Sequence, residues 1–137
     1  MNSIRVPGVN ATWGVKPMVA VWLALVSSVS GQCEVQTLIA IDAAQNDYAG
    51  KSVSVSGNVA VVGANKDDAG FESGAAYIYR DKAGKWEQET KLTASDPAPQ
   101  DFFGRSVAIS GDAVLVGAYA DDDAAESSGS AYVFRFD

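Results

Sequence analysis

The residues of this sequence that could do chemistry are carboxylates gathered in two short segments. They are Asp67, Asp68 and Glu72 in the first segment, and Asp121, Asp122, Asp123 and Glu126 in the second. Carboxylate oxygens suit Ca²⁺, and a bound cation would relieve the repulsion between neighbouring carboxylates, about 1 kcal/mol per pair at ~4 Å in water. These residues are therefore our candidate calcium ligands. The alternative, which we favour, is that both segments are solvated turns that keep the protein soluble.

The composition excludes much enzyme chemistry. With no His, the chain lacks a Ser-His-Asp or Cys-His nucleophile pair, a His general base and any His metal ligand. The single Cys, Cys33, excludes Cys-rich zinc sites and disulfides within the chain. Paired carboxylates suit a glycoside hydrolase, but no sequence feature places an acid in an apolar pocket. We expect no catalytic residue, no enzyme activity and no required cofactor. The net charge of −7 gives no excess of positive charge that would attract nucleic acid.

The N-terminal part of the chain differs from the rest in charge. The only charged side chains before Glu34 are those of Arg5 and Lys16, whereas all 17 acidic residues lie at Glu34 or later. An apolar stretch at 17–26 follows these basic residues, with small residues after it. This order predicts a signal peptide at 1–31, because a membrane span needs about 20 apolar residues. We expect a secreted or cell-surface protein with no membrane insertion once the leader is removed.

Two other interpretations of the N-terminal segment remain open. It could be an uncleaved anchor or a buried helix. It could also belong to a lipoprotein, since Cys33 lies just past the apolar stretch, although Gln32 stands where a lipoprotein signal needs a small residue. In an exported chain Cys33 would be unpaired or paired with another chain.

The rest of the sequence contains an internal repeat. When residues 38–72 are shifted by 54 positions, identical residues fall opposite each other at many positions spread along the stretch. The pairs include Leu38/Leu92, Asp42/Asp96, Asp47/Asp101, Gly50/Gly104, Ser52-Val53/Ser106-Val107, Ser56-Gly57/Ser110-Gly111, Val62-Gly63-Ala64/Val116-Gly117-Ala118 and Asp67-Asp68/Asp121-Asp122. One inserted residue near Ser127 then pairs Ala76-Tyr77 with Ala131-Tyr132.

Each copy has the pattern of short strands, with no helical periodicity. Alternating and wholly apolar runs predict strands at 51–56, 59–64, 75–80 and 86–93 in the first copy, and at 105–110, 113–118 and 130–136 in the second. Gly57-Asn58 and Gly111-Asp112 supply two-residue turns. A further strand at Val35–Ile41 matches the fourth strand. The fold class is therefore all-β.

Four strands in a repeat of this length are typical of a β-propeller blade, and a two-sheet sandwich is the alternative. We expect blade 1 at about 50–93 and blade 2 at about 104–137, with the strand at 35–41 as a spare blade strand. Aromatic residues at alternating strand positions are expected in the core between blades, and small residues at the strand ends would let blades approach. These residues are Trp86, Tyr77, Tyr79, Tyr132 and Phe134, and Gly63-Ala64 and Gly117-Ala118. Asp42, Asp47, Asp96 and Asp101 are expected to form turns between blades.

Several segments of the second copy resemble the FG-GAP repeat, most closely its bacterial exported subtype. They are Phe103-Gly104, Ser106–Asp112, Val116-Gly117-Ala118 and Ser128–Phe134. The resemblance covers residues 38–137, so we treat 32–137 as the repeat region; in the first copy Ala49-Gly50 replaces Phe-Gly. It implies β-propeller blades like those of integrin α chains, with a non-enzymatic role in adhesion or in binding an extracellular protein or glycan.

The calcium site of integrin-type repeats has no counterpart in this sequence. Those repeats bind calcium through a D-x-D-x-D-G-x-x-D loop, whose place is taken here by Gly57-Asn58 and Gly111-Asp112. Two-residue turns supply too few oxygens, since Ca²⁺ takes about 6–8. A calcium-dependent module built on the acidic segments named above is the alternative function.

Two blades cannot close a ring, because rings close at about 4–8 blades. Blade faces and sheet edges therefore remain exposed. Two explanations are open. The chain is a fragment of a longer repeat protein, which we favour, or several copies assemble into a homo-oligomer that supplies the other blades.

Overall fold

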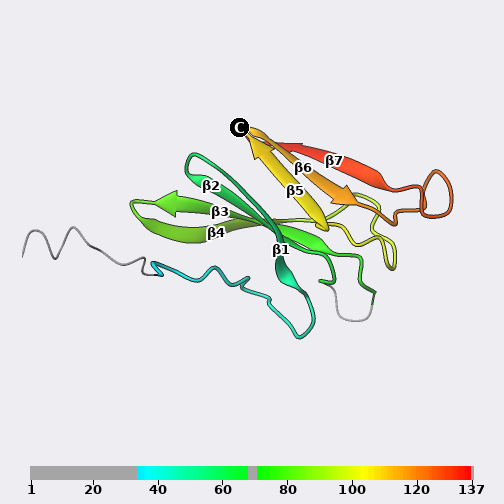
Figure 1. The fold of residues 1–137 in the computed structure, drawn as a ribbon, viewed down its shortest axis with the longest axis horizontal. Helices are drawn as coiled ribbons and strands as arrows, with labels where there is room; N and C mark the ends of the chain where they lie inside the picture. The colour runs from blue at the N-terminus through cyan, green and yellow to red at the C-terminus, as the bar shows by residue number, and fades with distance from the viewer. Residues whose placement is uncertain (1–33, 68–70, 137) are drawn as a thin grey trace, which may run out of the picture. The chain divides into compact units, whose positions relative to one another are not determined.

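The computed structural model describes residues 34–67 and 71–136, and in this part of the chain it contains strands but no helices (Figure 1). The all-β prediction is confirmed. None of the residues described forms a helix that is long and apolar enough to cross a membrane. The predicted signal peptide at 1–31 and Cys33 lie outside the described residues. Gln36–Asp137 forms one compact unit, to which the following description applies.

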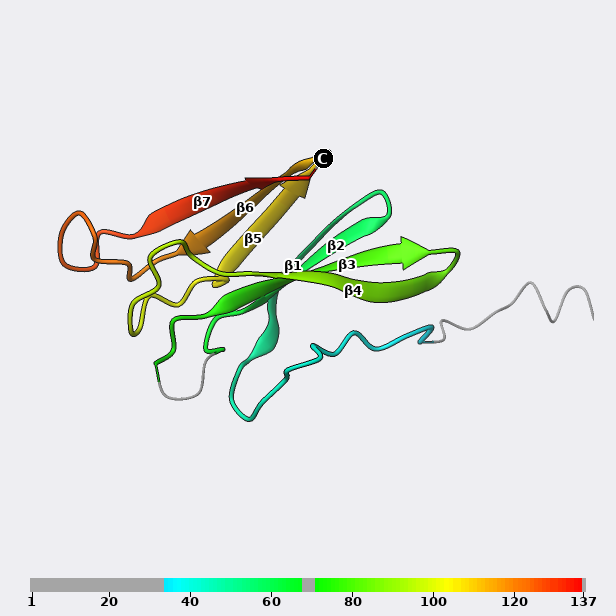
Figure 2. The same cartoon turned by 180° about the vertical axis from the view of Figure 1, so that it is seen from behind.

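The strands form two antiparallel sheets in which neighbours along the chain are neighbours in the sheet (Figures 1 and 2). The first sheet has the order β1-β2-β3-β4 and consists of β1 (Ala49–Ser56), β2 (Val59–Ala64), β3 (Ala75–Lys82) and β4 (Lys85–Leu92). The second has the order β5-β6-β7 and consists of β5 (Ser106–Ser110), β6 (Ala113–Ala118) and β7 (Ser130–Arg135). The second sheet thus has three strands in the described residues, one fewer than the first.

The tight turns between β1 and β2 and between β5 and β6 lie at the positions predicted from their glycines. Gly57 and Gly111 have φ of 58° and 57°, in the left-handed region that glycine enters without strain. They connect β1 to β2 and β5 to β6, so both hairpins keep the same register. The prediction of two-residue turns at these positions is confirmed.

The strand predicted at Val35–Ile41 is not formed. The Gln36 side chain pairs with the backbone of Trp86 instead, accepting from its nitrogen at 2.9 Å and donating to its oxygen at 2.7 Å. The backbone nitrogen of Ile41 donates to the Gln88 side chain at 2.9 Å. Residues 36–41 are therefore held to β4 by side-chain hydrogen bonds and do not form a backbone ladder with it.

A hydrophobic core lies between the two sheets. Its buried members are Val59, Val61, Ala76, Ile78, Ala94, Phe103, Val114, Val116 and Ala118, and Leu92, Val107, Ile109, Tyr132, Phe134 and Phe136 pack against it. A second cluster covers the other face of the first sheet, where Ala40 and Leu38 pack with Ala64, Ala75, Tyr77, Tyr79, Ala60, Val62 and Trp86. Tyr132 and Phe134 thus pack against the core between the two sheets, as predicted, whereas Tyr77, Tyr79 and Trp86 belong to the second cluster.

Two glycines allow the second repeat to approach the first sheet closely. A Cβ added to Gly63 would lie 2.0 Å from the carbonyl oxygen of Gly104. A Cβ added to Gly104, which has φ of +85°, would lie 2.1 Å from the carbonyl oxygen of Ala75. The Ser52 hydroxyl donates to the Gly104 oxygen at 2.8 Å, and Phe103 forms an isolated parallel bridge with Gly74. The expected role of Gly63 at the contact between blades is confirmed.

Candidate functional site

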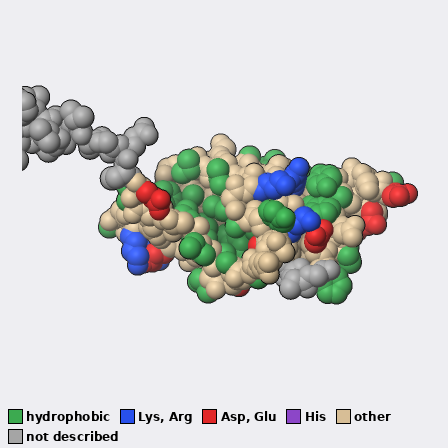
Figure 3. All heavy atoms as spheres, turned by 60° about the horizontal axis from the view of Figure 1, so that its bottom comes forward, with side chains coloured by type: hydrophobic (Ala, Val, Ile, Leu, Met, Phe, Trp, Pro, Cys, Tyr) green, Lys and Arg blue, Asp and Glu red, His purple; other side chains and the backbone are tan. Residues whose placement is uncertain are grey.

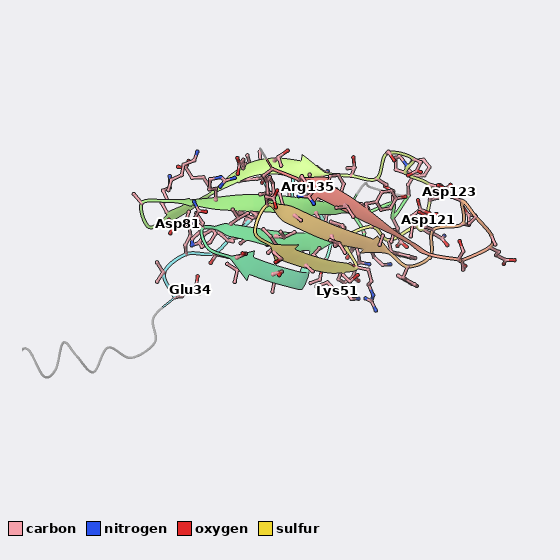
Figure 4. All side chains as sticks on the ribbon, turned by 90° about the horizontal axis from the view of Figure 1, so that it is seen from above. Glu34, Lys51, Asp81, Asp121, Asp123 and Arg135 are labelled. Carbon is pink, nitrogen blue, oxygen red and sulfur yellow. The ribbon has the colours of Figure 1, made fainter. Side chains whose placement is uncertain are left out.

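The long connections all leave the same end of the two sheets (Figure 1). They are the segments 42–48, 65–74, 93–105 and 119–129, whereas the opposite ends of the strands carry the tight turns. We call this the loop end. Figure 4 shows Asp121 and Asp123 at the loop end and Asp81 at the opposite end. Every acidic residue that was proposed above as a calcium ligand and that the structure describes belongs to the loop end.

A buried tyrosine joins two aspartates in the first repeat. The Tyr77 hydroxyl on β3 lies 2.8 Å from Asp42 Oδ1 and also contacts Asp67 Oδ2. A phenol has one proton, so it donates to one carboxylate at a time. Lys91 of β4 supplies the missing positive charge, with Nζ 2.8 Å from both Asp42 and Asp67. The cluster is therefore satisfied within the chain.

The pKa values in this cluster follow from burial and pairing. Burial raises the pKa of Tyr77 far above its usual range, and the Asp67 and Asp42 carboxylates raise it further. The hydrogen bond from Lys91 lowers the pKa of Asp42. Burial lowers the pKa of Lys91, but its bonds to Asp42 and Asp67 outweigh burial and raise it. The Asp42 carboxylate and the Lys91 ammonium group are thus both held in their charged forms.

The second repeat contains the same tyrosine and two aspartates. The Tyr132 hydroxyl lies 2.8 Å from Asp96 Oδ1 and 2.7 Å from Asp121 Oδ2. The Asp121 carboxylate also accepts from the backbone nitrogen of Asp123 at 3.0 Å. In the described part of the chain no lysine takes the place that Lys91 has in the first cluster.

In the second repeat, which lacks that lysine, the pKa values of the carboxylates shift in opposite directions. The backbone nitrogen of Asp123 and the Tyr132 hydroxyl lower the pKa of Asp121. Hydrogen bonds from Tyr132 and Asp123 lower the pKa of Asp96. The pKa of Asp123 is raised, first by its hydrogen bond with Asp96 and then by the charge of Asp121. Asp123 is therefore the carboxyl group that retains a proton most readily.

The calcium candidates do not form a ligand shell. Asp67 is buried against Tyr77 and Lys91, and Glu72 pairs with Lys66 at 2.6 Å. Asp122 and Glu126 are exposed, Asp121 and Asp123 belong to the second cluster, and Asp68 lies outside the described residues. Among the residues that the structure describes, no three acidic, Cys or His residues are grouped so that they could hold a metal ion. Calcium binding stays a prediction.

Two of the aspartates between the repeats form turns, as predicted. The Asp47 carboxylate accepts from the backbone nitrogen of Ala44 at 2.5 Å, and that of Asp101 accepts from Ala98 at 2.6 Å. Asp42 and Asp96 were expected to do the same, but their carboxylates bind the tyrosine hydroxyls instead. The sequence could not show this, because each tyrosine lies on a distant strand.

An aromatic–cation row crosses both repeats at the loop end. In spatial order it consists of Lys51, Tyr48, Lys66, Phe102, Tyr119 and Arg105. Each cation lies 5.6–5.7 Å from the centre of a neighbouring ring, and the Phe102 and Tyr119 rings stack at 5.3 Å with 15° between their planes. Tyr48 and Tyr119 are 52% and 58% exposed. Figure 3 shows basic side chains beside hydrophobic ones on the face turned toward the viewer.

Sequence reasoning missed this row, although the repeat contained a signal. Tyr48 and Phe102 are equivalent under the shift of 54 residues, and both have positive φ, 55° and 56°. Each follows an aspartate turn, at Asp47 or Asp101, so the same backbone places an aromatic ring outside the sheet in both repeats. Aromatic residues at matched loop positions were the available clue. Lys51 and Arg105 are matched by the same shift, whereas Lys66 and Tyr119 have no counterpart of the same type in the other repeat.

A comparison with known protein families bears on both repeats. The model of the FG-GAP repeat matches residues 33–79 and 86–134. The chain belongs to the FG-GAP repeat family. The second match begins in β4, so the FG-GAP repeat unit consists of a fourth strand followed by the first three strands of the next sheet. Residues 36–41 take the place of that fourth strand in the first unit. No curated protein matches the chain.

Proposed function

We propose that this FG-GAP chain is an exported, non-enzymatic module of the β-propeller type that acts in adhesion by binding an extracellular protein or glycan. The observation that carries the proposal is the aromatic–cation row at the loop end. Binding residues are commonly found on loops that a rigid scaffold positions, and these loops leave two packed sheets.

The chemistry of the row selects an acidic ligand with flat apolar faces. Lys51 and Arg105 place positive charge at the two ends of the row in a protein of net charge −7, and between them Lys66 is paired with Glu72. Cations of this type bind carboxylates and sulfates, and the exposed rings of Tyr48 and Tyr119 offer apolar stacking surfaces. An acidic polysaccharide fits both features, and so does an acidic segment of an extracellular protein.

Calorimetric titration with a uronic-acid oligosaccharide, oligogalacturonate, tests the glycan side of this function. We expect Tyr119→Ala and Lys66→Ala to weaken binding at least fivefold. Lys82→Ala is the matched control, because Lys82 lies at the opposite end of β3 and its side chain is 62% exposed. If oligogalacturonate and an acidic peptide both fail to bind, or if the row variants bind like the control, the proposal is wrong.

A calcium-dependent version of the module is the second candidate. Its support is the charge of the second cluster, where Asp96, Asp121 and Asp123 lack the lysine of the first cluster, although the described acidic residues are not grouped as a metal site. Calcium would then order the acidic loop before the ligand docks. We expect Ca²⁺ to raise the thermal unfolding midpoint and EDTA to reverse the change, with Asp121→Asn insensitive to both. Equal midpoints in Ca²⁺ and EDTA would discard this version.

A further inference from the structure

Each sheet leaves apolar side chains uncovered on one face. On the β5–β7 sheet, Leu115 is 46% exposed and Val133 is 63% exposed, and Ala131 beside them is also exposed. On the β1–β4 sheet, Val53 and Val55 of β1 are 66% and 65% exposed. These side chains point away from the core between the two sheets, so that core does not account for their hydrophobic character.

The repeat shows what these two faces are built to contact. Leu115, Ala131 and Val133 are the counterparts of Val61, Ala76 and Ile78, which are fully buried in the core between the sheets. Val53 and Val55 are the counterparts of Val107 and Ile109, which pack against that same core from the other side. The chain therefore exposes both halves of an interface that it also contains once in buried form.

From this we infer that copies of the chain associate head to tail. The outer face of the β5–β7 sheet in one copy packs against the outer face of the β1–β4 sheet in the next, where Leu38 and Ala40 leave Val53 and Val55 uncovered, as the two sheets pack within the chain. The two faces differ, so the contact is heterologous, and identical faces do not meet across a two-fold axis. The occupant of each face is a second copy, because that copy carries the complementary half.

The free edge of β7 gives the second copy a further attachment point. In the first sheet, β3 pairs with β4, with Ala76 opposite Leu92. β7 is the counterpart of β3, and no strand of the described residues pairs with its outer edge. Residues 36–41 of the next copy occupy the family position of a fourth strand. Ile39 and Ile41 of this segment are 68% and 85% exposed. The segment is therefore placed to add to β7 as an intermolecular strand.

Backbone geometry that is the same in both repeats supports this arrangement at the junction. Gly50 has φ of +90° and Gly104 has φ of +85°, but a Cβ added to Gly50 meets no atom within 4 Å. In the junction, Gly50 of the second copy would approach Gly117, as Gly104 approaches Gly63 within the chain. Ala49 replaces Phe103 in this position, so the contact between copies buries less apolar surface than the one within the chain. We therefore expect association to depend on concentration.

Light scattering coupled to size exclusion, with sedimentation velocity, tests the inference on the full chain. We expect a mass of two or more chains that rises with concentration. Val133→Glu destroys the β5–β7 face and Val53→Glu destroys the β1–β4 face, so each variant alone should be monomeric. An equimolar mixture of the two variants still offers one intact face of each kind and should form dimers. Ala124→Glu adds the same charge on an exposed loop and should associate like the unmodified chain.

Three results would overturn head-to-tail association. One is an unmodified chain that is monomeric at every concentration. Another is a Val53→Glu variant that still dimerises alone, which would mean that two β5–β7 faces meet. The third is a mixture of the two variants that stays monomeric. Circular dichroism shows whether each variant keeps its sheets, and Val133→Ser with Val53→Ser repeats the comparison if a glutamate disturbs them. Ligand binding by the aromatic–cation row does not enter these measurements.

Discussion

The hydroxyl oxygen of Tyr132 lies 2.8 Å from the carboxylate of Asp96, so β7 is bonded to the segment that connects the two sheets. Tyr77 and Asp42 make the same contact at the same distance in the first repeat. In both repeats the tyrosine also contacts the aspartate in the loop before its own strand. Each tyrosine therefore ties three separate segments together at the loop end.

Removing the Tyr77 hydroxyl should destabilise the fold. In Tyr77→Phe, the buried Asp67 carboxylate and the more exposed Asp42 carboxylate lose a donor. Hydrogen bonds to charged groups contribute about 1.5–3 kcal/mol, so we expect the free energy of unfolding in urea to fall by about 2 kcal/mol. Tyr119→Phe is the control, because Tyr119 is 58% exposed and should change stability by less than about 0.5 kcal/mol. Equal stability of Tyr77→Phe and the unmodified chain would contradict this role.

Lys91 should matter more than the other lysines of the first sheet. In Lys91→Met, the buried carboxylate of Asp67 keeps its charge without a cation. Losing one partner of a buried pair costs about 3–5 kcal/mol, but Lys91 is 27% exposed, so we expect a loss of about 1–3 kcal/mol. Lys82→Met, at a side chain 62% exposed, should cost little. The double variant Lys91→Met/Asp67→Asn should recover stability, and failure to do so would show that the lysine acts through packing alone.

Acid should destabilise the protein through the aspartates of both clusters. The pKa values of Asp42, Asp96 and Asp121 are lowered in the folded state. Their contribution is complete above the unfolded pKa of about 3.9 and is lost as the pH falls through the folded pKa. We expect the free energy of unfolding to be flat between about pH 7 and 5 and to fall below about pH 4. Urea unfolding at a series of pH values measures this, and Asp121→Asn should reduce the slope.

Asp123 should have the opposite effect on stability. Its pKa is raised, so its contribution is present below the unfolded pKa and is lost as the pH rises through the folded pKa. Asp123→Asn removes this charge while keeping a donor for Asp96. We therefore expect the variant to be more stable than the unmodified chain at pH 7, and to lose that advantage in acid. A variant that is less stable at pH 7 would show that the ionised carboxylate is needed there.

The matched glycines Gly63 and Gly117 should respond differently to a methyl group. At Gly63 the added Cβ would lie 2.0 Å from a backbone oxygen, which cannot move without separating the sheets. At Gly117 the nearest atom is the hydroxyl of Ser106 at 2.4 Å, and that side chain can rotate. We expect Gly63→Ala to cost about 3 kcal/mol and Gly117→Ala to cost less than about 1.5 kcal/mol. Thermal unfolding in dilute solution makes the comparison, and equal costs would refute the close approach.

Much of the fold could be predicted from the sequence. The strand positions, the two glycine turns and the burial of the strand aromatics follow from local periodicity and local backbone freedom. The strand at Val35–Ile41 was predicted wrongly because its pattern matches a fourth strand. A strand also needs a backbone ladder with a neighbouring strand, and a pattern along the chain does not show whether that ladder forms.

The sequence by itself determined the duplicated all-β unit, since a residue's place in a strand or turn depends on its neighbours along the chain. Only the tertiary structure decided what the carboxylates do. Asp67 and Asp121, read from sequence as calcium candidates, bind tyrosines on other strands, and Lys91 reaches the first cluster from β4. It also assembled the aromatic–cation row from four loops and the start of β1. These contacts join residues far apart in the chain, and folding alone brings such residues to the same place.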